Sequence, residues 1–225
     1  MTHPRLTEEL RERPDGDLLE SAISLCFITP NAIERLNALW PERVASYRSR
    51  SNTDDIVREK ATVLTAYVVH NLGVAVEASR DVLKDERDIT EDQEIIVKIE
   101  EAALWYRLID ELSYVQFPEQ RLRFMSFFED NLSNVLALQG AEPETITATM
   151  AARSEEYAQY RDWVAGDNQS VAGTLLWNAA KHIAVPLGCE HDPIFTTLFA
   201  ERFINRVVQA MVYELLTGKQ RATAK

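Results

Sequence analysis

The sequence predicts an all-α fold, a single-domain bundle of about eight helices built around two central apolar helices. Glycine and proline are scarce, with 7 and 8 residues in a chain of 225, and this leaves little material for the tight turns of an all-β fold. Hydrophobic residues make up 46% and charged residues 27%, which is ordinary for a globular protein and argues against disorder. Apolar residues also recur at helical spacing along most of the chain.

Three segments are expected along the chain. Residues 1–16 read as a charged N-terminal arm that ends in turn-forming residues, and residues 218–225 as a short, basic, flexible tail. Residues 17–217 form the helical domain between them. If this domain has a seam, it lies near residues 140–143, where a glycine is closely followed by a proline.

Two short helices are predicted at the start of the domain. Asp17 and Glu20 have the spacing of a capping box and open a helix that runs to about Phe27. Asn31 then begins a second helix, which continues to Trp40 and meets a proline at the next residue.

The first central helix is predicted from about Thr53 to Leu83. Its middle part, Ala61 to Val76, carries no formal charge and is apolar on every side, which is typical of a buried helix. It is shorter than the roughly 20 apolar residues that a membrane span requires. We therefore interpret it as a core helix, with this stripe inward: Val57, Ala61, Leu64, Val68, Leu72, Ala75 and Val82.

The second central helix is predicted from Gln93 to Val115. Thr90 and Gln93 have the spacing of a capping box, and the helix that follows is apolar on most of its faces. Arg107 is placed to pair with an acidic residue three or four positions further on. The adjacent pair Glu100 and Glu101 reads as part of a solvated face.

Proline and glycine set the limits of the next two helices. Pro118 starts one that Gly140 closes, and Pro143 opens another that Gly166 closes. The second of these has a sparse apolar stripe, so we expect it to be the most exposed major helix. The predicted core positions of the first are Leu122, Met125, Phe128, Leu132 and Val135.

The last two helices are shorter predictions. One runs from about Ser170 to Ala184 and is largely apolar. The other begins at Asp192 and Pro193, a pair that combines an N-cap residue with a proline in the first turn.

The charge balance excludes some partners. The 24 Lys and Arg residues against 36 Asp and Glu residues give a formal charge of −12, which repels nucleic acids and anionic membranes. Two distant cysteines do not make a disulfide scaffold, and the charged N-terminus does not resemble a signal peptide. We therefore expect a cytoplasmic protein with neither a nucleic-acid nor a membrane partner.

Four polar residues on apolar helices are candidates for lining a ligand pocket: His70, Arg107, Asp110 and His182. A buried neutral imidazole can act as a ligand or a base, and a guanidinium can bind an anion or a carbonyl group. A structural interpretation exists for each one, because buried polar groups are normally hydrogen-bonded and charges three or four positions apart pair along a helix.

Two other groups of residues are candidate sites. Phe124 and Phe127 lie beside the core positions of their helix, and an aromatic edge exposed there would indicate an interface. Cys189 to Asp192 places four metal-binding side chains next to one another, but zinc ligands are normally separated by two or more residues. We predict no metal there, and no sequence feature identifies a cofactor.

Two classes of function remain open. The first is an interaction or assembly protein that acts as a homo-oligomer or as a subunit of a complex. The second is a small-molecule-binding protein or enzyme with a pocket between the central helices. The first is preferred, because the sequence holds no Gly-rich phosphate loop, no Gly-x-Ser-x-Gly and no His-Glu-x-x-His motif.

Overall fold

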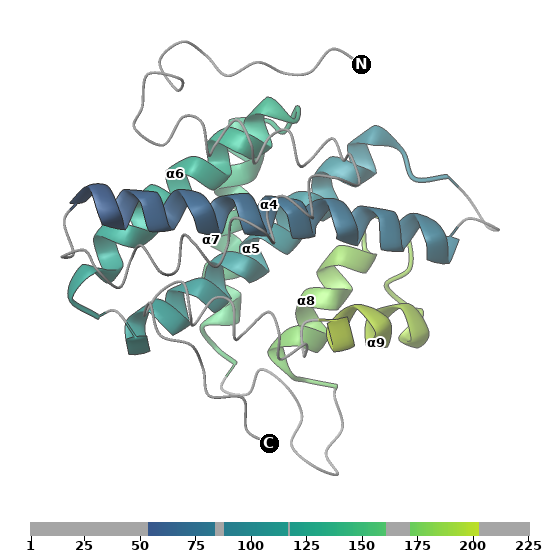
Figure 1. Ribbon diagram of the computed structural model, residues 1–225. Coiled ribbons are helices and arrows are strands. Elements are labelled where there is room, and N and C mark those ends of the chain that lie inside the picture. Colours follow the sequence, from purple (N-terminus) through teal and green to yellow (C-terminus); the bar gives the residue numbers. More distant parts are fainter. Residues whose placement is uncertain (1–53, 84–87, 117, 161–171, 203–225) are drawn as a thin grey trace, which may run out of the picture.

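The computed structural model describes residues 54–83, 88–116, 118–160 and 172–202. Within these ranges the chain forms helices and no strand, which confirms the all-α prediction. The two helices predicted before residue 41, the charged arm and the basic tail lie outside the described residues. None of the described helices is both long enough and apolar enough to span a membrane. The elements, shown in Figure 1, are α4 (Asp54–Leu83), α5 (Glu91–Gln116), η1 (Pro118–Gln120), α6 (Arg121–Leu138), α7 (Pro143–Tyr157), α8 (Leu175–Ala184) and α9 (Pro193–Arg202).

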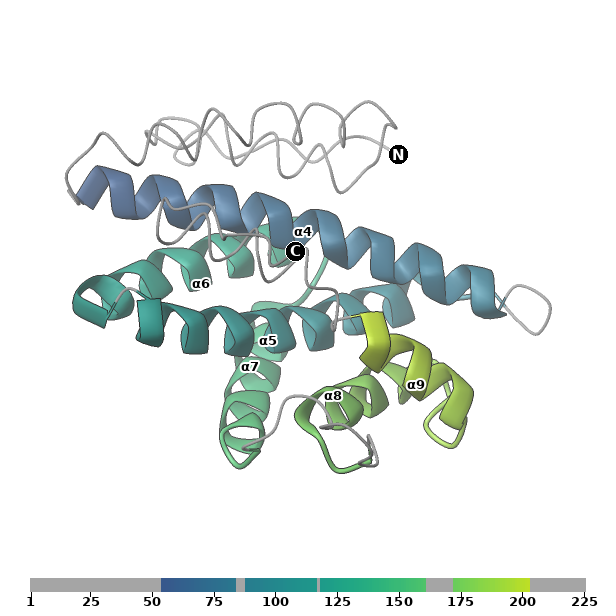
Figure 2. The same ribbon diagram turned by 60° about the horizontal axis from the view of Figure 1, so that its bottom comes forward.

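Helix α5 lies at the centre of the bundle. It packs against α4, α6, α7 and α8, and Figure 2 shows α4 on one side of it and α7, α8 and α9 on the other. Helix α4 packs most extensively on α6. The two predicted central helices are thus confirmed, and five positions of the predicted α4 stripe are buried: Val57, Ala61, Leu64, Val68 and Leu72.

Two helix starts are fixed by the caps that the sequence predicts. At the start of α5 the Thr90 N–H donates to Gln93 Oε1 at 2.9 Å, and the Gln93 N–H donates to Thr90 Oγ1 at 3.3 Å. At the start of α9 Asp192 Oδ1 accepts hydrogen bonds from the N–H groups of Ile194 and Phe195. Each cap satisfies N–H groups that have no partner within the helix.

Gly140 ends α6 and turns the chain toward α7. Its φ of 100° is one that a residue with a Cβ rarely adopts. The Gly140 N–H donates to the Ala137 carbonyl and the Ala141 N–H to the Leu136 carbonyl, which is the Schellman arrangement. Helix α7 then begins at Pro143, as predicted, but it ends at Tyr157 rather than near residue 166.

The predicted core face of α6 is correct except at its first position. Met125, Phe128, Leu132 and Val135 are buried, whereas Leu122 is 79% exposed. Leu122 lies in the first turn of α6, and Figure 1 shows this helix starting at one end of the bundle. The apolar stripe therefore continues along the helix beyond the point where the core ends.

Candidate functional site

The two charged candidates on α5 are held by different partners. Arg107 Nη2 lies 3.6 Å from Glu111 Oε2, one helical turn further on, which confirms one of the pairings predicted for this arginine. Asp110 instead accepts two hydrogen bonds of 2.7 Å, from Nε and Nη2 of Arg121 at the start of α6. The hydrogen bond to Asp110 raises the pKa of Arg121. This bidentate pair joins the end of α5 to the start of α6.

The third candidate, His182 on α8, faces α7. Its Nε2 lies 2.8 Å from Glu156 Oε1, and its ring centroid lies 6.4 Å from that of Tyr157. The fourth candidate, His70, belongs to α4, but its side chain is outside the described part of the structure. The structure thus gives Arg107, Asp110 and His182 separate partners within the protein.

Arg153 connects His182 to the central helix. Its Nε and Nη2 donate to the two carboxylate oxygens of Glu100 on α5, at 2.7 and 3.0 Å, and its Nη1 donates to Glu156 at 2.9 Å. Five residues from three helices are therefore in one cluster, which we call the three-helix cluster: Glu100 from α5, Arg153, Glu156 and Tyr157 from α7, and His182 from α8. Its two carboxylates face one guanidinium and one imidazole.

Tyr157 is the buried end of the three-helix cluster. Its side chain has no exposed surface, and its hydroxyl has no hydrogen-bond partner among the residues that the structure describes. Burial, together with the negative charge of Glu100, raises the pKa of this phenol above its ordinary value. The hydroxyl therefore stays protonated at neutral pH and does not act as a base there.

The chemistry available to the three-helix cluster is limited by its own ion pairs. The guanidinium of Arg153 already binds two carboxylates, so an incoming anion would meet a neutralised arginine beside Glu100 and Glu156. The imidazole of His182 is directed at Glu156. The arrangement ties α5, α7 and α8 together, which is a structural role.

Sequence reasoning identified His182 but not its partners. Glu100 and Glu101 were expected on a solvated face, and this is wrong, because both are buried near the middle of α5, where other helices surround it. A usable signal was present, since a carboxylate within an apolar helix requires a buried cation or donor. Arg153 is 53 residues away from Glu100, so no rule of local spacing links the two.

The two phenylalanines proposed for an interface differ in exposure. Phe124 is completely buried and stacks on Phe128, with ring centroids 6.4 Å apart, so it belongs to the core and offers no surface to a partner. Phe127 is partly exposed and carries the guanidinium of Arg58 over its ring at 4.3 Å. Only Phe127 of this pair remains available to an interface.

Three of the four adjacent metal-binding side chains lie in different environments. Cys189 is buried and its Sγ donates to the Leu187 carbonyl, Asp192 caps α9, and the side chain of His191 is almost fully exposed. Across the described ranges no group of three or more His, Cys, Asp or Glu residues is placed to hold a metal ion.

Two phenols should make the protein sensitive to alkali. Burial and the nearby carboxylate of Glu129 raise the pKa of Tyr106 to about 12, and the pKa of Tyr157 is raised as well. Between pH 10 and 12 the unfolded chain loses these protons while the folded chain keeps them, so the free energy of unfolding should fall as the pH rises. Urea unfolding at pH 9, 10 and 11 measures this slope.

Variants identify the source of that slope. Tyr106→Phe and Tyr157→Phe should each make the alkaline loss smaller, whereas Tyr114→Phe, at a position that is 65% exposed, should leave it unchanged. At pH 7, Tyr157→Phe should change the free energy of unfolding by no more than about 0.5 kcal/mol. An unchanged slope in the double variant Tyr106→Phe/Tyr157→Phe would contradict this explanation.

Comparisons of the chain with protein-family models, with curated proteins and with solved structures give no match.

Proposed function

We propose that this chain is an assembly protein, which acts by binding other protein chains as a homo-oligomer or as a subunit of a complex. The observation that carries the proposal is the pairing of the polar residues that a ligand pocket would need. Arg107, Asp110 and His182 are each engaged by an acidic or basic side chain of the same protein. Asp110 and His182 are hydrogen-bonded and Arg107 lies in an ion pair, with only its Nε buried and without a hydrogen-bond partner among the described residues, so surface contacts become the better explanation of what the chain does.

The exposed apolar residues support this proposal. The described residues include five large hydrophobic side chains that are exposed: Ile96, Tyr114, Leu122, Val185 and Ile194. Single exposed hydrophobic residues are common, but two of these flank one turn, because Tyr114 precedes η1 and Leu122 follows it. Two cysteines in a chain of 225 residues do not make a disulfide scaffold, and on this ground we place the protein in the cytoplasm.

Native mass spectrometry, compared with the mass of the denatured chain, tests the proposal. We expect a species at a multiple of the chain mass of 25.6 kDa, without an added small molecule. A monomer at every concentration would contradict homo-oligomer formation. A bound small molecule that is lost on denaturation would instead favour the second class of function, a ligand-binding protein or enzyme.

A further inference from the structure

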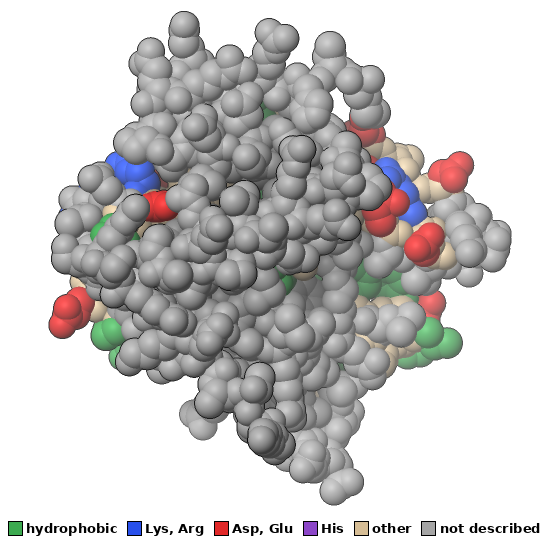
Figure 3. Space-filling view, viewed as in Figure 1, with side chains coloured by type: hydrophobic (Ala, Val, Ile, Leu, Met, Phe, Trp, Pro, Cys, Tyr) green, Lys and Arg blue, Asp and Glu red, His purple; other side chains and the backbone are tan. Residues whose placement is uncertain are grey.

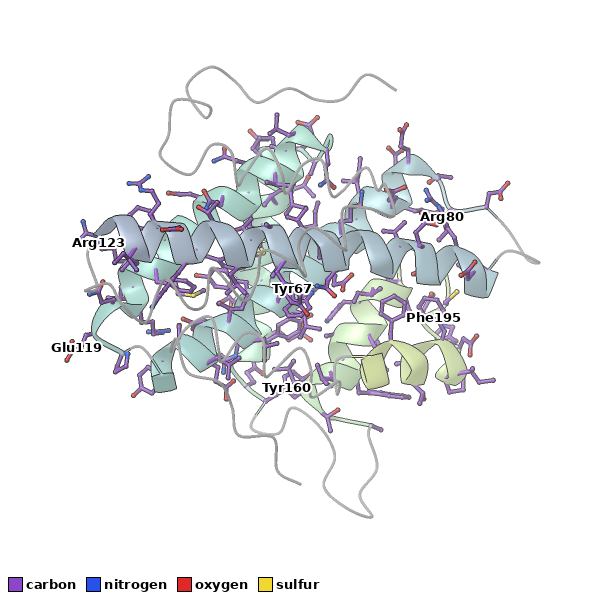
Figure 4. All side chains as sticks on the ribbon, in the orientation of Figure 1. Tyr67, Arg80, Glu119, Arg123, Tyr160 and Phe195 are labelled. Carbon is purple, nitrogen blue, oxygen red and sulfur yellow. The ribbon has the colours of Figure 1, made fainter. Side chains whose placement is uncertain are left out.

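We draw no further inference here: the strongest candidate, the surface patch at the turn from α5 to α6, where Tyr114 and Leu122 are exposed near Glu119, which Figure 4 labels, and where Figure 3 shows hydrophobic and acidic side chains together at the surface, carries none because nothing in the structure shows what covers it.

Discussion

Replacing Arg153 with methionine is expected to lower the free energy of unfolding by about 2–3 kcal/mol. Methionine keeps much of the side-chain length but removes the guanidinium that binds Glu100 and Glu156. The side chain of Glu100 is only 10% exposed, so its carboxylate would be left nearly buried without its cation. Because Arg153 itself is 20% exposed, water can compensate for part of the loss, and we place the effect below that of a fully buried pair. Urea unfolding at neutral pH measures it.

Two further variants separate the ion pair from a general effect of substitution in α7. Glu155→Gln changes an exposed neighbour on the same helix and should alter the free energy of unfolding by no more than about 0.5 kcal/mol. Glu100→Leu removes the carboxylate, so Arg153→Met should cost much less when it is added to that variant. Equal costs of Arg153→Met in both backgrounds would show that the three-helix cluster does not act through this pair.

The parts of the fold that could be predicted from the sequence depend on residues close together in the chain. The capping box at Thr90, the cap at Asp192 and the glycine at Gly140 are local interactions, and the structure contains all three. The apolar run from Ala61 to Val76 likewise identifies a buried helix, because a helix without a polar face has no surface suited to water.

What could not be predicted depends on which helices pack together. Asp110 pairs with Arg121 across a turn, and Glu100 pairs with Arg153 on a helix that comes much later in the chain. Helical spacing describes partners on one helix only, and it cannot choose among several distant arginines. The prediction that Leu122 is buried was wrong for a related reason, because periodicity describes the face of a helix but not how far the neighbouring helices extend along it.

Leu132→Ala should lower the free energy of unfolding by about 3 kcal/mol, whereas Leu122→Ala should change it by no more than about 0.5 kcal/mol. Both leucines lie on α6 and on the apolar stripe that the sequence assigns to the core. Leu132 is 1% exposed and packs within the core, so its removal leaves a cavity. Leu122 faces solvent, so its truncation leaves no cavity. Urea unfolding, at a protein concentration where native mass spectrometry detects only the monomer, compares the two variants directly.

The same pair of substitutions links the fold to the proposed assembly. Leu122 has little to contribute within one copy, so an apolar side chain at this exposed position gains burial only against a partner. Leu122→Ala should therefore weaken self-association at concentrations where Leu132→Ala, as long as it remains folded, does not. A large loss of stability in Leu122→Ala would show that this side chain is part of the fold. Unchanged stability with weakened association would assign Leu122 to the surface between copies.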